Sequence, residues 1–405
     1  MKNIYALSNN GENKMKIYIT GIGMDGKETL TAEALSSIKN AEILIGAKRM
    51  LKPFAELGKK TYESWKADEI AAYLKKNAFE NAVVLMSGDC GFYSGAEKMI
   101  SALDGFETEI ICGISSPVYF CSKIGIAWQN MHFISLHGLN GNIVRNVRRN
   151  KFCFFLLGGD ITPSDICKKL CDYNLSKIRV FIGENLAYKN ERIYQGTAAD
   201  FTAFQSEKLC VMIAENPDFE RGILSGIKDD NFIRGNVPMT KSEVRSAVIS
   251  KLEIESDSIC WDIGCGTGSV TTEMALQAYD GKVFAVDKNA EAIELSKKNS
   301  VKFGCDNIKT INGTAPDCLL DLPAPDRVFI GGSCGKINEI IKIVREKNPS
   351  ALVVITAVSL ETLEQAAAAF FNPEIVQISI TRTRKIGLST MLSAENPIFI
   401  IKGHL

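Results

Sequence analysis

The chain has 405 residues, of which 46% are hydrophobic and 23% are charged. This length is too great for one ordinary core and predicts two domains of roughly 200 residues. Its 47 basic and 47 acidic side chains balance to a net charge of zero, so it lacks the basic footprint of a nucleic-acid-binding protein. No apolar run approaches the about 18 residues that cross a bilayer, and we expect a cytoplasmic protein with no membrane contact.

Short apolar runs alternate with helical stretches in the first half of the chain. These runs are Lys16–Gly23, Ala41–Gly46, Ala82–Asp89, Phe152–Asp160, Arg179–Leu186 and Lys208–Ala214. Runs of this length that are rich in Val, Ile and Phe are typical of strands covered on both faces. Between them, Thr162, Pro163 and Asp165 predict a helix start with a threonine N-cap, a proline at the first position and an acid at the third.

A polar stretch with little periodicity, Glu215–Asn236, predicts the domain boundary near Arg221, so that the two domains span 15–215 and 223–405. The second domain has predicted strands at Ser258–Gly264, Lys282–Asp287, Lys309–Gly313, Asp326–Gly332, Ala351–Ala357, Glu374–Ile380 and Pro397–Gly403. The first five alternate with helical stretches, which implies right-handed crossovers and a parallel sheet. The last two look like a closing antiparallel pair. This α/β pattern resembles the seven-stranded sheet of a Rossmann-like class I methyltransferase.

The twelve cysteines and three histidines limit the chemistry that the chain can perform. The closest cysteine pairs are Cys167 with Cys171 and Cys260 with Cys265, and no Cys-x-x-Cys occurs, so we expect no metal site. The shortage of histidine argues against a mechanism that needs several of them. For His137, a ligand contact and a structural hydrogen bond both remain open.

A glycine turn, WDIGCGTGS at Trp261–Ser269, follows a predicted strand and opens a helix. Glycines allow a sharp turn and the close approach of a ligand to the backbone. Asp262 precedes the glycines, and Asp287 ends the next strand, where a carboxylate can accept both hydroxyls of a ribose. The pattern predicts a nucleoside cofactor; the alternative is a tight strand–helix turn without a ligand. We interpret Cys265 as a small loop residue.

Two details of this region separate the candidate cofactors and acceptors. A dinucleotide fingerprint needs glycine where the chain has Ser269, which disfavours an NAD-dependent dehydrogenase. An acid directly before the glycines is more typical of S-adenosylmethionine sites. After the fourth strand the chain reads FIGGSCG, without the Asn/Asp-Pro-Pro-aromatic stretch of amine methyltransferases. Base N-methylation is therefore disfavoured, and Gly331 and Gly332 leave room for a bulky acceptor.

The run PMTKSEVRSAVISK, Pro238–Lys251, precedes the glycine turn, and its Thr240 and Glu243 have the spacing of a capping box. With the glycine turn and GTAPD at Gly313–Asp317, this run resembles the decarboxylating precorrin C15-methyltransferase family of cobalamin biosynthesis, over about residues 223–405. The resemblance implies S-adenosylmethionine contacts from Thr240, Asp262, Gly264, Cys265, Gly266, Thr267, Gly268, Asp287 and Ala315.

Four segments of the first half point to a second cofactor site: Leu44–Leu51, Ser87–Met99, Gly113–Gly138 and Gly183–Thr197. Together they resemble the tetrapyrrole methylase superfamily, most of all its precorrin C5-methyltransferase members. That resemblance implies a two-lobed fold that binds S-adenosylmethionine between the lobes. The implied contacts are Ser87, Gly88, Asp89, Phe92, Ser115 and Ser116. For Asp89 by itself, a helix cap is the alternative.

Two positions depart from the pattern of that superfamily. Its first turn is usually G-x-G-P-G, whereas here Met24 and Asp25 follow Gly23. Its S-G-D-P stretch has Cys90 in place of proline. Because proline fixes φ, we expect both replacements to loosen the loops.

The two halves together resemble the precorrin-6Y C5,15-methyltransferase (decarboxylating) family, a fusion of the two domain types. The resemblance implies two S-adenosylmethionine sites per chain, methylation of a corrinoid tetrapyrrole at C5 and C15, and decarboxylation of its C12 acetate. Arginine and lysine suit the carboxylates of such a ring, and the candidates are Lys241, Arg245, Arg382 and Arg384. The alternative for Thr381–Lys385, TRTRK, is a solvated turn between the last two strands.

Several alternatives remain open from the sequence. One is that only the C15-methylating, decarboxylating half is active and the first domain is a binding module. Others are a methyltransferase for RNA or protein, and a non-catalytic binding protein. A homo-oligomer is expected by resemblance. Residues 1–14 precede the usual family start, and the sequence leaves open whether the substrate ring already carries cobalt.

Overall fold

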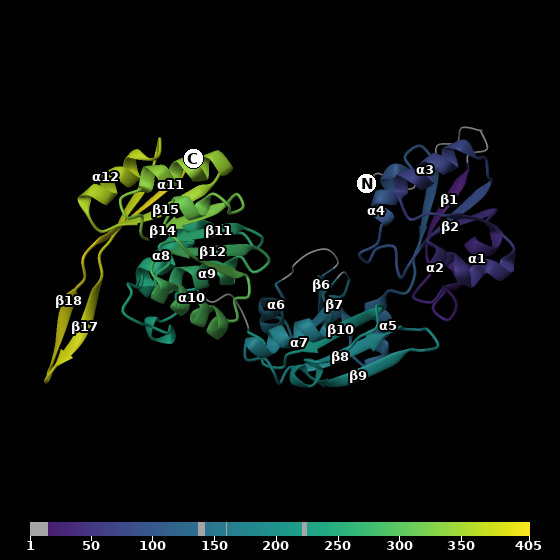
Figure 1. Cartoon of the computed structure of the whole chain (residues 1–405), viewed down its shortest axis with the longest axis horizontal. Helices are drawn as coiled ribbons and strands as arrows, with labels where there is room; N and C mark the ends of the chain where they lie inside the picture. The colour runs from purple at the N-terminus through teal and green to yellow at the C-terminus, as the bar shows by residue number, and fades with distance from the viewer. Residues whose placement is uncertain (1–14, 137–141, 159, 221–224) are drawn as a thin grey trace.

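The computed structural model describes residues 15–136, 142–158, 160–220 and 225–405. The interpretations made for residues 1–14, His137 and Arg221 fall outside these ranges. Three large sheets follow one another along the chain, and Figure 1 shows them side by side along the long axis of the molecule. The α/β class expected from the sequence is confirmed. No helix in the described part of the chain combines the length and the apolarity that a bilayer crossing requires.

The first sheet is entirely parallel, with strand order β3-β2-β4-β1-β5. Its strands are β1 (Lys16–Gly21), β2 (Ile43–Gly46), β3 (Lys60–Glu63), β4 (Asn81–Met86) and β5 (Glu107–Ile111). The helices of this lobe are α1 (Ala32–Asn40), α2 (Lys48–Leu51), α3 (Ala67–Lys76) and α4 (Ala96–Ala102), with a 3-10 turn at Lys52–Leu57. The central strands β1, β2 and β4 are almost wholly buried, as their apolar runs predict.

The second sheet is mixed, with strand order β6-β7-β10-β8-β9, in which only β6 and β7 are parallel. Its strands are β6 (Met131–Ser135), β7 (Phe152–Leu156), β8 (Arg179–Glu184), β9 (Arg192–Thr197) and β10 (Cys210–Glu215). The helices are α5 (Ser116–Ile124), α6 (Ile143–Arg149) and α7 (Pro163–Asp172), with short 3-10 turns at Trp128–Asn130 and Ala198–Phe201. Thr162 caps α7 in a capping box with Asp165, which confirms the predicted helix start.

The third sheet has seven strands in the order β13-β12-β11-β14-β15-β19-β16. The parallel strands are β11 (Ile259–Ile263), β12 (Lys282–Asp287), β13 (Ile308–Asn312), β14 (Arg327–Ile330) and β15 (Leu352–Ala357). At one edge, β16 (Glu374–Ile378) and β19 (Ile398–His404) form the expected antiparallel pair. Five helices accompany the sheet: α8 (Ser242–Leu252), α9 (Ser269–Gln277), α10 (Ala290–Phe303), α11 (Ile337–Lys347) and α12 (Leu360–Ala368). Further 3-10 turns lie at Asp229–Asn231 and Asp317–Leu319.

Helices cover both faces of this third sheet. Along β11 the buried side chains alternate: Trp261 and Ile263 pack with α11 and α12, whereas Cys260 packs with α8 and α9. Alternation along a strand sends successive side chains to opposite faces, so both faces of β11 are apolar. The carboxyl ends of the parallel strands are thereby left as the open edge of the domain.

A two-stranded hairpin, β17 (Thr381–Ile386) and β18 (Ser389–Ala394), is inserted between β16 and β19. It projects away from the sheet as a long ribbon, at the lower left of Figure 1. The solvated-turn interpretation of TRTRK is therefore wrong, because these residues form the first strand of the ribbon. Apart from the half-buried Arg382, the residues of both strands are exposed.

The predicted capping box at Thr240 is also wrong. The N-cap of α8 is Lys241, without a side-chain cap hydrogen bond. Glu243 instead forms an ion pair with Arg382 of the hairpin. Thr240 lies one residue before this N-cap and is available to the pocket described below.

The loops that lack proline are tied by other contacts, contrary to the expected loosening. The Asp25 carboxylate accepts hydrogen bonds from the backbone N–H groups of Lys27, Glu28 and Thr29. Burial by itself would raise the pKa of Asp25, but these hydrogen bonds outweigh it and lower the pKa. The Cys90 thiol is buried, 3.5 Å from the carbonyl oxygens of Ile19 and Ile111.

A polar junction joins the second and third sheets. The Asp306 carboxylate accepts the backbone N–H groups of Val144 and Arg145, each at 3.0 Å, at the start of α6. The Asn142 amide donates to the carbonyl oxygens of Tyr279 at 2.8 Å and Gly281 at 2.9 Å. These contacts connect residues about 140–160 positions apart in the chain.

Candidate functional site

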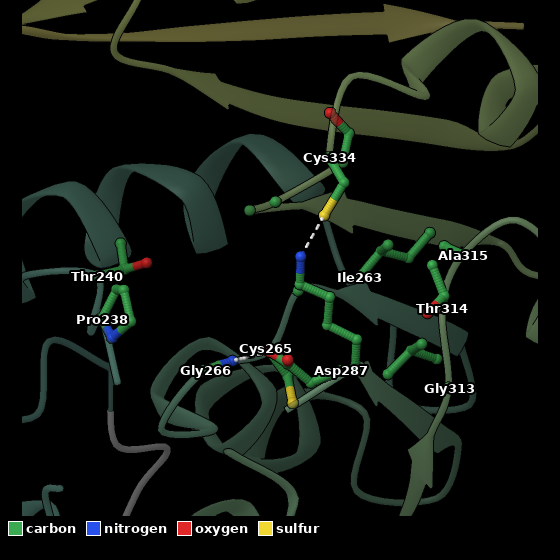
Figure 2. A pocket seen from close by; sticks show the side chains of 16 residues that line it. Pro238, Thr240, Ile263, Cys265, Gly266, Asp287, Gly313, Thr314, Ala315 and Cys334 are labelled. Atoms are coloured by element: carbon green, nitrogen blue, oxygen red, sulfur yellow. Dashed lines mark hydrogen bonds between the residues drawn. The ribbon is translucent and has the colours of Figure 1, made fainter. Parts of the chain in front are cut away.

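A pocket of about 240 Å³ opens at the carboxyl ends of β11, β12 and β14. Figure 2 shows its side chains converging from these strand ends and from the segment before α8. It is lined by Pro238, Thr240, Ile263, Gly264, Cys265, Gly266, Val286, Asp287, Lys288, Gly313, Thr314, Ala315, Gly331, Gly332, Ser333 and Cys334. Ligands of open α/β sheets bind at this edge, where strand order reverses between β11 and β14.

The glycine loop approaches its neighbours too closely for side chains. Gly264 has φ +78°, and a Cβ there would lie 2.7 Å from the backbone nitrogen of Gly332. Gly266 has φ +53°, and a Cβ there would lie 2.5 Å from the carbonyl oxygen of Pro238. The loop is therefore held between the segment before α8 and the loop after β14, with bare backbone along the pocket wall.

Asp287 fixes this loop and keeps capacity for a ligand. Its Oδ2 accepts from the Gly266 N–H at 3.0 Å, and its Oδ1 accepts from the Asn289 N–H at 2.9 Å. A carboxylate has about four lone-pair sites, so two more donors can be accepted, such as the hydroxyls of a ribose. Thr240 and Ala315, also predicted as contacts, lie in the same pocket wall.

Asp262 lies beneath the loop and outside the pocket wall. Its side chain is fully buried, its Oδ2 accepts from the Thr271 hydroxyl, and its Oδ1 has no partner among the described residues. Burial raises the pKa of Asp262 to about 7, although the hydrogen bond from Thr271 opposes the rise. This carboxyl can therefore hold a proton near neutral pH.

The remaining loop residues support the turn. Cys265 lines the pocket but is mostly buried, and burial raises the pKa of its thiol, which suits a small loop residue and not a nucleophile. Thr267 is buried, and Gly268, with φ +74°, is the N-cap of α9; neither lines the pocket.

Lys288 and Cys334 are among the pocket residues that were not singled out from the sequence. Lys288 follows Asp287, and its Nζ lies 3.2 Å from Sγ of Cys334, in the loop after β14. Figure 2 shows this contact spanning the pocket. Cys334 has φ +52°, which is uncommon for a residue other than glycine and marks local strain. The sequence did contain a signal for Lys288, because it directly follows the acid Asp287 at the end of a predicted strand.

The four candidate substrate cations do not gather at this pocket. Arg245 is fully buried and donates to Glu273 Oε1 and the Thr240 carbonyl oxygen, each at 2.6 Å. The assignment of Arg245 to substrate binding is therefore wrong, because its guanidinium is buried and makes its hydrogen bonds to other groups of the protein. Lys241 caps α8, Arg382 is ion-paired with Glu395 and Glu243, and Arg384 is exposed on the hairpin. None of the four lines the pocket.

A second pocket, of about 180 Å³, lies between the first two sheets. It is lined by Met24, Arg49, Ser87, Ser116, Leu156, Leu157, Gly183, Asn185, Leu186, Tyr188, Lys208, Leu209, Cys210 and Val211. The lobes meet beside it, because the Tyr188 hydroxyl donates to the Met24 carbonyl oxygen at 2.8 Å. Of the predicted contacts, Ser87 and Ser116 lie in its wall.

The other predicted contacts of this half shape the nearby loops. Asp89 accepts from the N–H groups of Gly91 at 2.8 Å and Gly113 at 2.9 Å, so it ties loops together and does not cap a helix. Gly88, with φ +72°, pairs with Gly23. Phe92 packs against Phe133 and Phe154, and Ser115 is the N-cap of α5.

The described residues contain no group of three or more His, Cys, Asp or Glu side chains placed to hold a metal ion. Neither His132 nor His404 lines either pocket.

The strand order of the third sheet, its glycine loop and the acid at the end of β12 define the Rossmann-like methyltransferase class. Residues 231–403 match the family described as "Precorrin methyltransferase domain", and residues 16–202 match "Tetrapyrrole (Corrin/Porphyrin) Methylases".

Similar proteins include single-domain relatives of the second half. A probable cobalt-precorrin-6B C(15)-methyltransferase (decarboxylating) from Pyrobaculum calidifontis is 40% identical over 186 residues, which are 44% of this chain and 95% of that protein. A protein of the same description from Saccharolobus solfataricus is 42% identical over 192 residues, which are 45% of this chain and 96% of that protein. The chain belongs to this family of decarboxylating precorrin methyltransferases, with a tetrapyrrole methylase domain preceding the shared part.

Solved structures with similarity include a precorrin-6Y C5,15-methyltransferase from Geobacter metallireducens, 36% identical, covering 44% of this chain and 95% of that chain with a TM-score of 0.41. A cobalamin biosynthesis precorrin-6Y methylase from Archaeoglobus fulgidus is 20% identical and covers 50% of this chain and 98% of that chain, with a TM-score of 0.40.

Proposed function

We propose that the chain methylates a precorrin-type corrinoid ring at C5 and C15 and decarboxylates its C12 acetate, with S-adenosylmethionine as methyl donor. The observation that carries this proposal is the pairing of two methylase-type pockets in one chain whose second half belongs to the decarboxylating C15-methyltransferase family. The two domains are proposed to span 15–215 and 223–405.

The hydrogen-bonding groups and the shape of the C-terminal pocket both fit S-adenosylmethionine. Gly264 and Gly266 leave bare backbone where a side chain would fill the wall, and Asp287 retains free lone pairs for the ribose. Thr240 and Ala315 close the pocket from two sides. When bound, the cofactor supplies an electrophilic methyl group on sulfur.

The chain's own residues orient and shield the reactants. Gly331 and Gly332 carry no side chains at the pocket wall after β14, which leaves space for a large ring against the bound cofactor. Fixing an electron-rich ring carbon in line with the methyl group and excluding water can supply much of the rate. A side-chain base is not required, which agrees with pocket walls that contain neither His132 nor His404.

The pocket between the first two sheets is proposed as a second cofactor site, with Ser87 and Ser116 in contact with the ligand. Gly88, Asp89, Phe92 and Ser115 are proposed to act by holding the surrounding loops. The alternative, that only the C15-methylating half is active, is disfavoured because Asp25 and Cys90 tie the loops in which proline is missing.

We also propose a cytoplasmic homo-oligomer without a nucleic-acid partner. An isolated two-stranded hairpin is marginally stable in water, and the β17–β18 ribbon exposes Ile386, Leu388, Met391 and Leu392. Both edges of the ribbon also carry unpaired backbone groups, which favours pairing with the ribbon of a second copy.

Mass spectrometry of the products tests the proposal, with metal-free precorrin-6B and cobalt-precorrin-6B as substrates. Gain of two methyl groups with loss of one carbon dioxide is the expected result. Gain of one methyl group with that loss would support the binding-module alternative for the first domain. An unchanged mass on both rings would refute the proposed function.

A further inference from the structure

The pocket between the first two sheets has an unusual charge pattern. Its wall includes Arg49, from α2 of the first lobe, and Lys208, just before β10 of the second lobe. None of its lining residues is acidic, and most of the rest are apolar. The pocket thus presents two cations from opposite lobes over an apolar floor.

Neither cation is neutralised within the described part of the chain. Nη2 of Arg49 donates to the Ser87 hydroxyl at 3.4 Å, and no ion pair of Arg49 or Lys208 with a described acid occurs. Both side chains are exposed, so they stand at the rim of the pocket and not in its floor. By contrast, Arg179 of the same lobe is paired with Glu215 at 3.2 Å.

Part of the pocket wall is a turn held by hydrogen bonds. Asn185 and Ala187 have φ values of +47° and +67°, and the Ala187 N–H donates to Glu191 Oε2 at 2.6 Å. This turn places Tyr188, whose hydroxyl reaches across to the first lobe at Met24. Strain of this kind persists where the surroundings determine it, and it commonly marks binding sites.

Two cations on opposite sides of the pocket opening match a flat ring with carboxylates on its periphery. We propose that Arg49 and Lys208 bind carboxylate side chains of the tetrapyrrole from opposite lobes and so fix its orientation for the N-terminal methyl transfer. The proposal rests on the proposed function. Because a pocket of about 180 Å³ is too small to enclose such a ring, the ring lies across the opening, where the two cations stand.

The test uses Arg49→Gln, Lys208→Gln and the double variant in the full chain. Charge-assisted hydrogen bonds are the strong polar contacts of a site, so each single change should raise the KM of the N-terminal step by about tenfold, and the double variant more. The affinity of the N-terminal site for S-adenosylhomocysteine, measured by calorimetry, should stay within about twofold, because the two cations are proposed to bind the ring and not the cofactor. Methylation and decarboxylation by the C-terminal half should be unchanged. Arg49→Lys should recover part of the loss.

Lys75→Gln on α3 and Lys177→Gln before β8 are matched controls, because both lysines are exposed and lie outside the pocket. An unchanged KM in the double variant would overturn the proposal. So would a parallel loss of S-adenosylhomocysteine affinity, since the cations would then hold the cofactor.

If the parent chain adds no second methyl group, the proposed function fails independently of this inference. Titration with an octacarboxylate porphyrin then tests the inference by itself. Weaker binding by the double variant than by both controls supports it, and equal binding refutes it.

Discussion

Nζ of Lys288 lies 3.2 Å from Sγ of Cys334, and the pair links the end of β12 to the loop after β14 across the C-terminal pocket (Figure 2). The Cys334 side chain is exposed, so its thiol is open to reagents in the free protein. Because both residues line the pocket, any ligand there changes the access of reagents to this thiol.

We therefore expect iodoacetamide to label Cys334 in the free protein and S-adenosylhomocysteine to protect it. Cys112 provides an internal control, since it is the other exposed cysteine of the described chain and lies outside both pockets. Peptide mass spectrometry gives both labelling rates from one sample. Equal protection of Cys112 and Cys334, or protection of neither, would contradict the location of the cofactor.

Asp262 makes stability depend on pH. The folded protein holds the carboxyl proton up to a pKa of about 7, whereas the ordinary value is 3.8, so the folded state binds more protons between these values. The contribution of Asp262 to stability is then fully present below about pH 4 and falls as the pH rises through 7, by an amount on the order of 2–4 kcal/mol. In Asp262→Asn without ligand, the difference in Tm between pH 5 and pH 8 should shrink. A difference as large as that of the parent would show that Asp262 is ionised throughout.

Two glycines of the pocket should respond differently to the same added methyl group. Gly264→Ala combines a positive φ with a clash against backbone, and it should cost roughly 1–3 kcal/mol and abolish S-adenosylhomocysteine binding at the C-terminal pocket. Gly332→Ala meets nothing closer than 3.9 Å and should leave Tm nearly unchanged. Thermal unfolding of the two variants compares them directly, and equal destabilisation would argue against the described loop packing.

Substitutions of Arg245 and Arg384, the two arginines first considered for substrate binding, should affect different properties of the protein. Arg245→Ala leaves Glu273 buried without its ion pair and should lower stability by about 3–5 kcal/mol. Arg384→Ala should leave stability unchanged and weaken substrate binding more than cofactor binding. Denaturant unfolding and substrate titration measure the two effects. Equal substrate affinity in Arg384→Ala and the parent would remove this residue from the substrate site.

The ribbon formed by β17 and β18 should control assembly. Leu388 and Leu392 are 109% and 73% exposed, so replacing both with serine removes apolar contact area without disturbing a core. Sedimentation equilibrium should show a smaller particle for the double variant than for the parent. Phe371→Ser, at another fully exposed apolar residue outside the ribbon, is the control and should not change the mass. A parent that is already monomeric would refute the proposed interface.

Burial explains which strands could be predicted from the sequence. Continuous apolar runs identified the interior strands of the first two sheets, because both faces of such strands are covered. The edge strands β3, β5, β6 and β9 were missed, since each has an unpaired side and a more polar sequence. The hairpin was missed for the same reason: its first strand reads TRTRKI, and the residues of both strands are exposed apart from Arg382.

The candidate site was predictable where backbone geometry dictates the residue type. Gly264, Gly266 and Asp287 were identified from the sequence because a tight turn and a strand end require them there. Arg245 was misassigned because a cation next to a motif does not reveal whether its partner is a ligand or a buried acid. Only the folded chain brings Glu273 to it, 28 residues away.

The contact of Asp306 with α6 has a consequence for the chain as a whole. The first N–H groups of that helix have their acceptor in the other half of the protein, and Arg145 behind them is wholly buried. Separation of the two halves would expose this carboxylate to water and leave the helix start without its acceptor. Unfolding of the second half would remove this acceptor, so we expect it to lower the stability of α6 in the first half.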